Sequence, residues 1–342
     1  MGPVYVHGVS VSLSWADPTR SLQDLIFVGV RDALRSAGMS ATELEAVVLA
    51  AHDLVDGRSL TSMVTAPAAA AYLKDETRVG DDGATAFALA DARVRSGSVQ
   101  TCLVAAWGRL SEGPVDAISH ALFDPFTTRP LAMTEIGVSG LRATRALAKH
   151  PGYAAHRQEA AARRGERAGD PGRIPAPAWP LRPAELPMWS DVVAAVVIGN
   201  TPAAVEVLGV GMSTEPFELG DRDLLGLPAL RAASGQALCG AQRGIADVDV
   251  LELDGMTLFD EALALEAVGA SAPGTGMAAL ATDRRLDPAG AAAMGYGAPA
   301  MGLARIARAS ERLTGGGGRT GLATGSSVVA AQSQTAVVLG KA

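Results

Sequence analysis

The chain has 342 residues, 39 of them glycine; 48% of its residues are hydrophobic but only 4% are aromatic. This composition is typical of a tightly packed α/β protein, and the length allows two similar halves. The formal net charge of −7, without a long basic run to offset it, argues against general nucleic-acid binding. The sequence has neither a basic leader followed by an apolar run nor an uncharged apolar stretch of membrane-spanning length, so we expect a cytoplasmic protein.

The cysteines and histidines show no spacing that is typical of a metal site. Cys102 and Cys239 are far apart in the sequence, and each lies within an apolar pattern. We therefore expect both thiols in the core, no disulfide framework and no bound metal.

The N-terminal part of the chain predicts a strand, a helix and a second strand. Residues 4–13 form a strand-like run, and residues 22–36 have the periodicity of an amphipathic helix that ends at Gly38. Residues 46–51 are a continuous apolar strand, and another helix is expected directly after Gly83.

Residues 112–187 differ in composition from the rest of the chain. They are rich in arginine and end in a proline-rich stretch, residues 174–180. We interpret them as an inserted loop domain that is helical from about residue 135 to residue 167.

The C-terminal part repeats the plan of the N-terminal part. Residues 194–198 and 204–210 predict two strands, residues 227–243 predict a helix, and residues 248–253 predict a buried strand after a stop at Gly244. The chain therefore divides into a first half, an insertion and a second half.

We place the two halves at residues 1–111 and 188–342. The helix after Gly83 in the first corresponds to a helix predicted over residues 299–313 in the second. Strands that alternate with helices predict sheets covered by helices. Two such copies predict an α/β fold with two sheets and one helix layer packed between them.

Several short motifs, taken in order and spacing, resemble those of the thiolase superfamily. The likeness covers nearly the whole chain and is greatest to sterol-carrier-protein or lipid-transfer-protein type thiolases. It implies a five-layered αβαβα fold of two duplicated halves with an inserted loop domain. The motifs are residues 79–86 (VGDDGATA), 130–134 (PLAMT), 190–191 (SD), 249–254 (DVLELD) and 295–304 (GYGAPAMGLA).

The residues at the catalytic positions of that family differ in this chain. Gly83 stands where the resemblance places the nucleophilic cysteine, Asp254 where it places the first histidine, and Tyr296 where it places the second. Residues 321–327 supply no second cysteine. Neither a covalent acyl-enzyme nor a cysteine-based condensation is therefore chemically available.

Each of these positions also has a plainer interpretation. Asp81 and Asp82 precede a helix, where carboxylates cap free backbone N–H groups. Tyr296 either fills the volume of a lost histidine or faces a cavity, and Asp254 either caps a turn or takes part in chemistry. If a site persists, we expect it between Gly83, Asp254, Tyr296 and residues 321–327, with backbone N–H groups near Gly83 and Ser326 forming an oxyanion site.

Two functions follow from the resemblance. Some thiolase relatives are aldolases of steroid side-chain degradation that cleave a β-hydroxyacyl thioester without a nucleophile. In that case Tyr296, with its pKa lowered locally, removes the β-hydroxyl proton and Asp254 assists, although no second tyrosine can be placed. The alternative is a catalytically silent scaffold subunit of a thiolase or acyltransferase complex.

The resemblance also implies ligands and partners. The substrate is an acyl thioester of coenzyme A or of a carrier protein, and no separate cofactor is expected. Arg163, Arg164 and Arg182 either form a solvated face or bind the phosphates of coenzyme A. We expect a dimer, with itself or with a thiolase-like chain, through a sheet edge at residues 101–106, and an OB-fold, zinc-ribbon partner.

Overall fold

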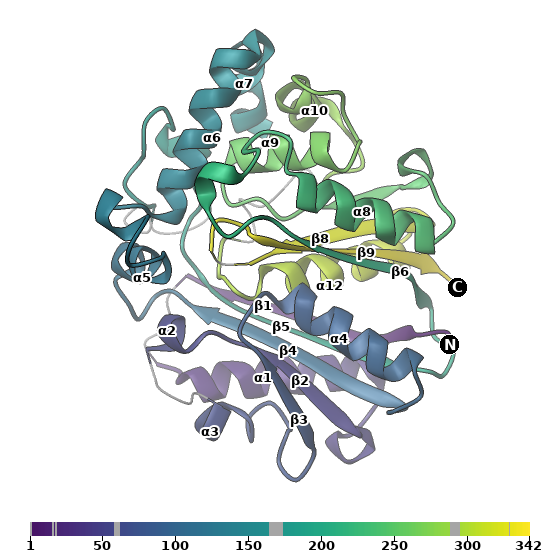
Figure 1. Cartoon of the computed structure of the whole chain (residues 1–342). Helices are drawn as coiled ribbons and strands as arrows, with labels where there is room; N and C mark the ends of the chain where they lie inside the picture. The colour runs from purple at the N-terminus through teal and green to yellow at the C-terminus, as the bar shows by residue number, and fades with distance from the viewer. Residues whose placement is uncertain are drawn as a thin grey trace.

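The computed structural model describes residues 2–15, 17, 19–57, 62–163, 174–287, 295–327 and 329–342. Strands and helices alternate along the chain, and two blocks of sheet are stacked with helices between and outside them (Figure 1). The predicted α/β class is thereby confirmed.

The first half contains the strands and helices that the sequence predicts, with two short helices between them. The amphipathic helix ends at Gly38, whose φ of 66° is the left-handed conformation that favours glycine at a helix C-terminus. The elements are β1 (Tyr5–Ser14), α1 (Leu22–Ala37), β2 (Ala46–Ala50), α2 (Asp53–Asp56), α3 (Ser62–Thr65), β3 (Asp75–Val79), α4 (Gly83–Arg95) and β4 (Thr101–Arg109).

The segment between the halves is helical. The single helical region expected from about residue 135 is two helices, because His150 leaves the helical conformation between them. These helices lie against the C-terminal half, at the top of Figure 1. The elements are α5 (Val115–Leu122), α6 (Glu135–Lys149) and α7 (Pro151–Arg163).

The second half repeats the alternation of the first. Its strand 250–252 is shorter than the run of residues 248–253 that the sequence indicated. The elements are β5 (Asp191–Gly199), β6 (Val205–Thr214), α8 (Pro228–Gly240), β7 (Val250–Glu252), α9 (Leu258–Ala267), α10 (Gly276–Thr282), α12 (Met301–Thr314), β8 (Thr320–Ser326) and β9 (Ser333–Lys341).

The strands of both halves form one hydrogen-bonded sheet of nine strands in the order β3-β2-β4-β5-β1-β6-β9-β8-β7. The sequence predicted two separate sheets. The halves are joined where β1 pairs with β6 over only two residue pairs, Tyr5 with Glu206 and Val6 with Val205. Beyond this junction the two blocks diverge, which leaves room for helices between them (Figure 1).

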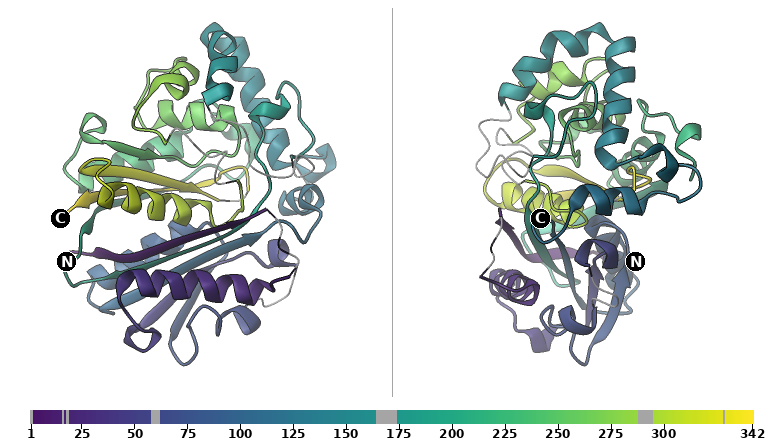
Figure 2. Two further views of the ribbon diagram at one scale, coloured as in Figure 1. Left: turned by 180° about the vertical axis from the view of Figure 1, so that it is seen from behind. Right: turned by 90° about the vertical axis from the view of Figure 1, so that its left-hand side faces the viewer.

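Helices α4 and α12 form the buried layer between the two blocks, as predicted. Each contacts the other and strands of both halves. Their small residues allow this close approach; a Cβ on Gly83 would lie only 2.6 Å from Cβ of Leu303. Helix α1 covers the outer face of the first block, and α8 covers the outer face of β6 and β9 (Figures 1 and 2).

Two expectations about individual residues are wrong. Strand β4 lies between β2 and β5, so residues 101–106 are not at a sheet edge; the free edges belong to β3 and β7. Cys102 is buried, but Cys239 is exposed, because α8 turns Ala233 and Ala237 toward the sheet and Cys239 away from it.

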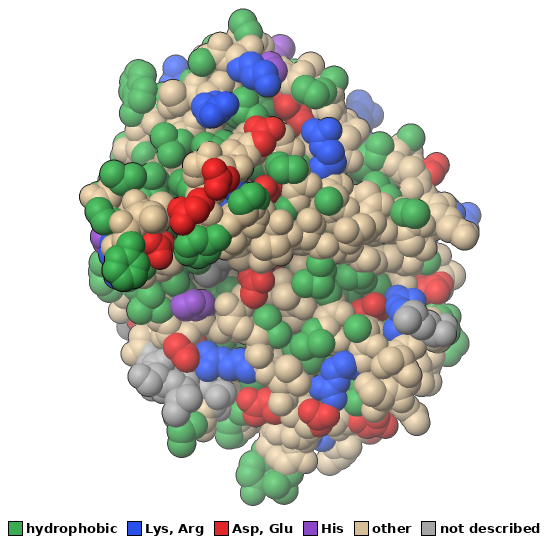
Figure 3. All heavy atoms as spheres, in the orientation of Figure 1, with side chains coloured by type: hydrophobic (Ala, Val, Ile, Leu, Met, Phe, Trp, Pro, Cys, Tyr) green, Lys and Arg blue, Asp and Glu red, His purple; other side chains and the backbone are tan. Residues whose placement is uncertain are grey.

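Surface properties agree with the composition. On the face seen in Figure 3, basic side chains are interspersed with acidic ones. Within the described ranges, no helix combines the length and the apolar character needed to cross a bilayer. Among the same residues, no group of three or more histidine, cysteine or acidic side chains is arranged to hold a metal ion.

Candidate active site

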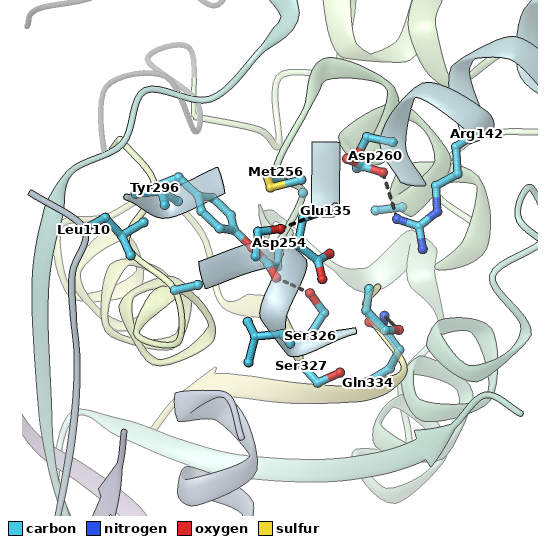
Figure 4. A pocket seen from close by; sticks show the side chains of 18 of the residues that line it. Leu110, Glu135, Arg142, Asp254, Met256, Asp260, Tyr296, Ser326, Ser327 and Gln334 are labelled. Atoms are coloured by element: carbon cyan, nitrogen blue, oxygen red, sulfur yellow. Dashed lines mark hydrogen bonds and ion pairs between the residues drawn. The ribbon is translucent and has the colours of Figure 1, made fainter. Parts of the chain in front are cut away.

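A cavity lies where the loop after β7, the loop after β8 and the segment around Tyr296 meet α5 and α6 of the segment between the two halves (Figure 4). The space between its walls, including solvent at its mouth, is about 870 Å³. Apolar side chains form most of the wall. The charged and hydroxyl-bearing residues are Ser119, Glu135, Ser139, Arg142, Asp254, Asp260, Tyr296, Ser326 and Ser327.

Asp254 is buried in this cavity. It follows β7, and its backbone N–H donates to Oγ1 of Thr324 on β8 at 2.9 Å. Its Oδ2 accepts a hydrogen bond from the Ser326 hydroxyl at 2.5 Å, whereas its Oδ1 has no hydrogen-bond partner among the residues described. Burial raises the pKa of Asp254, although the hydrogen bonds from Ser326 act in the opposite direction. One carboxylate oxygen is thus free to bind a ligand or a proton.

Tyr296 is held in place by its own backbone. Its N–H donates to the carbonyl of Met188 at 2.9 Å, and its carbonyl accepts from the N–H of Ser190 at 3.1 Å. Gly295, which precedes it, has a φ of 61°, and a Cβ there would lie 2.4 Å from Oγ of Ser190. The ring contacts Trp189 edge to face, with 6.0 Å between the ring centroids. Two neighbouring segments therefore fix the direction of the ring.

The environment of Tyr296 is the opposite of the one expected. Burial raises its pKa well above 10, and the nearby carboxyl groups of Asp254 and Glu135 raise it further. The prediction of a locally lowered pKa is therefore wrong. Tyr296 is a neutral phenol that points toward Asp254, which makes it a proton or hydrogen-bond donor rather than a base (Figure 4).

Gly83 is not part of the cavity. Its N–H donates to the carbonyl of Pro299 at 2.9 Å, and a Cβ on it would lie 2.8 Å from Cβ of Ala106. The place where the resemblance puts a nucleophile is therefore filled by the packing of α4 against its neighbours. The N–H of Gly83 is thus already engaged and is not available to the oxyanion site that was expected near Gly83 and Ser326.

Asp82 has the capping role expected of it, and a second one. Its Oδ1 accepts from the N–H of Ala84 in α4 at 2.8 Å, and its Oδ2 accepts from the N–H of Gly302 in α12 at 3.1 Å. One carboxyl group therefore caps both central helices. Burial and the neighbouring Asp254 raise the pKa of Asp82 well above its ordinary value.

The arginines proposed to bind phosphate do not meet at this cavity. Arg163 donates to the carbonyls of Leu280 and Asp283 at 2.8 and 2.6 Å, so its guanidinium joins α7 to the end of α10. Arg182 is exposed, and Arg164 lies outside the described residues. Within the described part of the chain, neither Arg163 nor Arg182 lines the cavity.

Sequence reasoning did not find Glu135. It is the first residue of α6, where a glutamate commonly interacts with the helix dipole, so nothing in the local sequence indicates that it faces a cavity. Its Oε1 accepts from the N–H of Ala330 at 2.8 Å. Burial raises the pKa of Glu135 to about 8.

Arg142 also lines the cavity, and its contacts are structural. It donates to Oδ1 of Asp260 at 3.0 Å and to the carbonyl of Ala330 at 3.1 Å. Asp260 in turn accepts from the hydroxyl groups of Ser139 and Thr257 at 2.6 and 2.7 Å. This network fixes α6 to α9 and to the loop after β8.

Comparison with solved structures shows that the fold is shared. The chain is similar to a structure described as an Ltp2-ChsH2(DUF35) aldolase, with a TM-score of 0.76 and 19% sequence identity over 99% of this chain and 98% of the other. No family model matches the sequence, and the search of curated proteins found no match. At this identity the likeness shows the fold alone.

Proposed function

We propose that the chain cleaves the Cα–Cβ bond of a β-hydroxyacyl thioester by a retro-aldol reaction without a covalent intermediate. The observation that carries the proposal is the buried Oδ1 of Asp254, which lacks a hydrogen-bond partner among the described residues and faces the cavity beside a neutral phenol. The shared fold with a protein described as an aldolase supports it.

The reaction needs a base and an electrophilic donor, and no nucleophile. Asp254 takes the β-hydroxyl proton; its raised pKa makes it a stronger base than an ordinary carboxylate. The Cα–Cβ bond then breaks, a carbonyl forms at Cβ, and the electron pair of that bond passes into the enolate of the departing thioester. Tyr296 donates a hydrogen bond to the enolate oxygen, which it can do because its phenol stays protonated.

The walls of the cavity suit an acyl substrate. The lining includes valine, isoleucine and leucine side chains of α5 and Leu230 of α8, together with the acidic groups. The substrate carries its own coenzyme A or carrier-protein thioester, so no further cofactor is invoked. Because the wall is mostly apolar, we propose that the acyl group belongs to the lipid or steroid class.

The experiment is a cleavage assay with a panel of β-hydroxyacyl thioesters, in which the aldehyde or ketone product is measured. Tyr296→Phe keeps the ring and its packing on Trp189 but removes the donor, and we expect cleavage to fall by about 10²–10⁴-fold. Asp254→Asn should lose activity to at least the same extent. The melting temperature of Tyr296→Phe should stay near that of the wild type.

A matched control is Tyr72→Phe, because Tyr72 is 72% exposed and lies outside the cavity. This variant should keep full activity. Unaltered cleavage by Tyr296→Phe would eliminate Tyr296 as the donor, and the absence of product from every thioester would reject the reaction.

The assay is run with and without an OB-fold, zinc-ribbon partner, which we propose as a second component. The structure with the same fold is described by a name that includes ChsH2(DUF35), and this supports testing a partner. A partner that is required for activity should raise cleavage from background to a measurable rate.

One observation favours the alternative of a silent scaffold subunit. The position of the nucleophile is closed by packing at Gly83, so the pocket of a thiolase is not retained there. A scaffold should cleave no thioester with or without a partner, yet should co-purify with a thiolase-like chain. The same panel of substrates therefore separates the two functions.

A further inference from the structure

Glu135 enters the cavity from the inserted segment, opposite the strands that carry Asp254. Its backbone N–H donates to Oγ of Ser119 on α5 at 2.9 Å, and the preceding Thr134 caps α6. The side chain then points inward, toward Asp254 and Tyr296 (Figure 4). Two carboxyl groups and one phenol thus converge from three different parts of the chain.

The loop after β8 holds the Glu135 carboxyl group in place. Ala330, whose N–H binds Oε1 of Glu135, has a φ of 52°, and so does Ala331, which lines the cavity. This left-handed conformation is costly for alanine and persists only where the surroundings impose it. Arg142 and Arg222 impose it here, because both donate to the carbonyl of Ala330, at 3.1 and 3.2 Å. The loop therefore holds Oε1 of Glu135 at a fixed place beside the cavity.

The charged groups around Glu135 come from several elements. Arg142 on α6 and Arg222 after β6 favour its ionised form, whereas Asp260 on α9 opposes it. The negative charge of ionised Glu135 raises the pKa of Tyr296 across the cavity. Burial outweighs the two arginines, so the pKa of Glu135 rises to about 8 and the group is mostly protonated at neutral pH.

We infer that Glu135 is the second proton-transfer group of the site and delivers a proton to Cα of the enolate. The inference rests on the proposed retro-aldol function and supplies its last step, the protonation of the enolate at Cα. Asp254 gains the β-hydroxyl proton, Glu135 gives its own proton to Cα, and the electron pair of the broken bond becomes the new C–H bond. One proton then passes from Asp254 to Glu135 through the open cavity, which restores both groups.

The test measures kcat and KM of Glu135→Gln and Glu135→Asp across pH with whichever thioester the wild type cleaves. Glu135→Gln keeps the shape of the side chain but cannot donate an acidic proton. We expect kcat to fall by about 10²–10⁴-fold with KM nearly unchanged. The wild-type kcat should decline above pH 8 as Glu135 loses its proton, and Glu135→Gln should lack this decline. Glu135→Asp, which keeps a carboxyl group, should have a higher kcat than Glu135→Gln and should again show part of the decline in kcat at high pH.

The matched control is Glu159→Gln, an exposed glutamate on α7 of the same inserted segment. It should behave as the wild type. If the wild type and Glu159→Gln cleave the thioester and Glu135→Gln does so equally well, the role of Glu135 is overturned while the retro-aldol function stands. If the wild type cleaves no thioester, the function fails and this role fails with it. If Glu135→Gln does not fold, Glu135→Asp is compared with the wild type instead, and a kcat equal to that of the wild type overturns the role of Glu135.

Discussion

The raised pKa of Glu135 predicts how stability depends on pH, whatever reaction the chain performs. The perturbation is Glu135→Gln, which replaces a titrating group by a neutral one of similar shape. Between pH 4.5 and about 8 the folded protein keeps a proton that the unfolded chain has lost. Stability rises with pH where the unfolded state binds more protons; here the folded state binds more, so the wild type loses stability as pH rises.

The magnitude follows from the width of that window. The free energy of unfolding falls by about 1.4 kcal/mol per pH unit while the folded and unfolded states differ by one proton. From the ordinary value of 4.5 to about 8, the loss from this group is on the order of 5 kcal/mol. Below pH 4.5 and above pH 8 the contribution is constant.

The assay is urea unfolding of the wild type and of Glu135→Gln at pH 4.5, 6, 7 and 9. Asp82 and Asp254 also titrate abnormally, but they are present in both proteins, so the difference between the two isolates Glu135. We expect Glu135→Gln to gain stability relative to the wild type by roughly 5 kcal/mol between pH 4.5 and 9. A difference that stays constant over this range would refute the burial argument and leave Glu135 an ordinary surface acid.

Two further predictions concern the position of the nucleophile at Gly83 and the edge of the sheet. Gly83→Cys should not form an acyl-enzyme with acyl-CoA in intact-protein mass spectrometry, and a stable adduct on the new cysteine would show that the position is open. Because its Cβ would lie 2.6 Å from Cβ of Leu303, the same substitution should lower the free energy of unfolding by roughly 1–3 kcal/mol in chemical denaturation. The chain should be a dimer in light scattering at micromolar concentration, joined through β3, one of the two free edges, in place of β4. Tyr72→Glu, in the exposed turn that precedes β3, should shift it toward monomer, whereas a monomeric wild type would contradict this.

The sequence predicted those parts of the fold that local patterns control. Helix α1 follows from its amphipathic periodicity and from Gly38, and the capping role of Asp82 follows from its place before a helix. The central position of α4 and α12 followed from the resemblance to thiolases and from the small residues of these helices. The same reasoning located Asp254, Tyr296 and Ser326 in one cavity, because it relied on the order of motifs along the chain.

The errors concern properties that depend on distant parts of the chain. The place of β4 in the sheet is set by the order of strands, which an apolar run cannot reveal. The pKa of Tyr296 is set by burial and by carboxyl groups from other segments, so the direction of its shift could not be inferred from the residues beside it in the sequence. Glu135 escaped notice for a related reason, since only the folded chain brings the start of α6 to the loop after β8 and to the cavity.

The double role of Asp82 makes the two halves unequal. Helix α12 has no side-chain cap of its own, because Ala300 occupies its N-cap, and its second residue, Gly302, is bound by a carboxylate from the other half. A helix N-cap of this kind typically contributes about 0.5–2 kcal/mol. The C-terminal half would lose that contribution if residues 188–342 were produced alone, whereas α4 keeps its cap within the N-terminal half. Helix α12 of the C-terminal half thus depends for its N-cap on a carboxyl group from the N-terminal half.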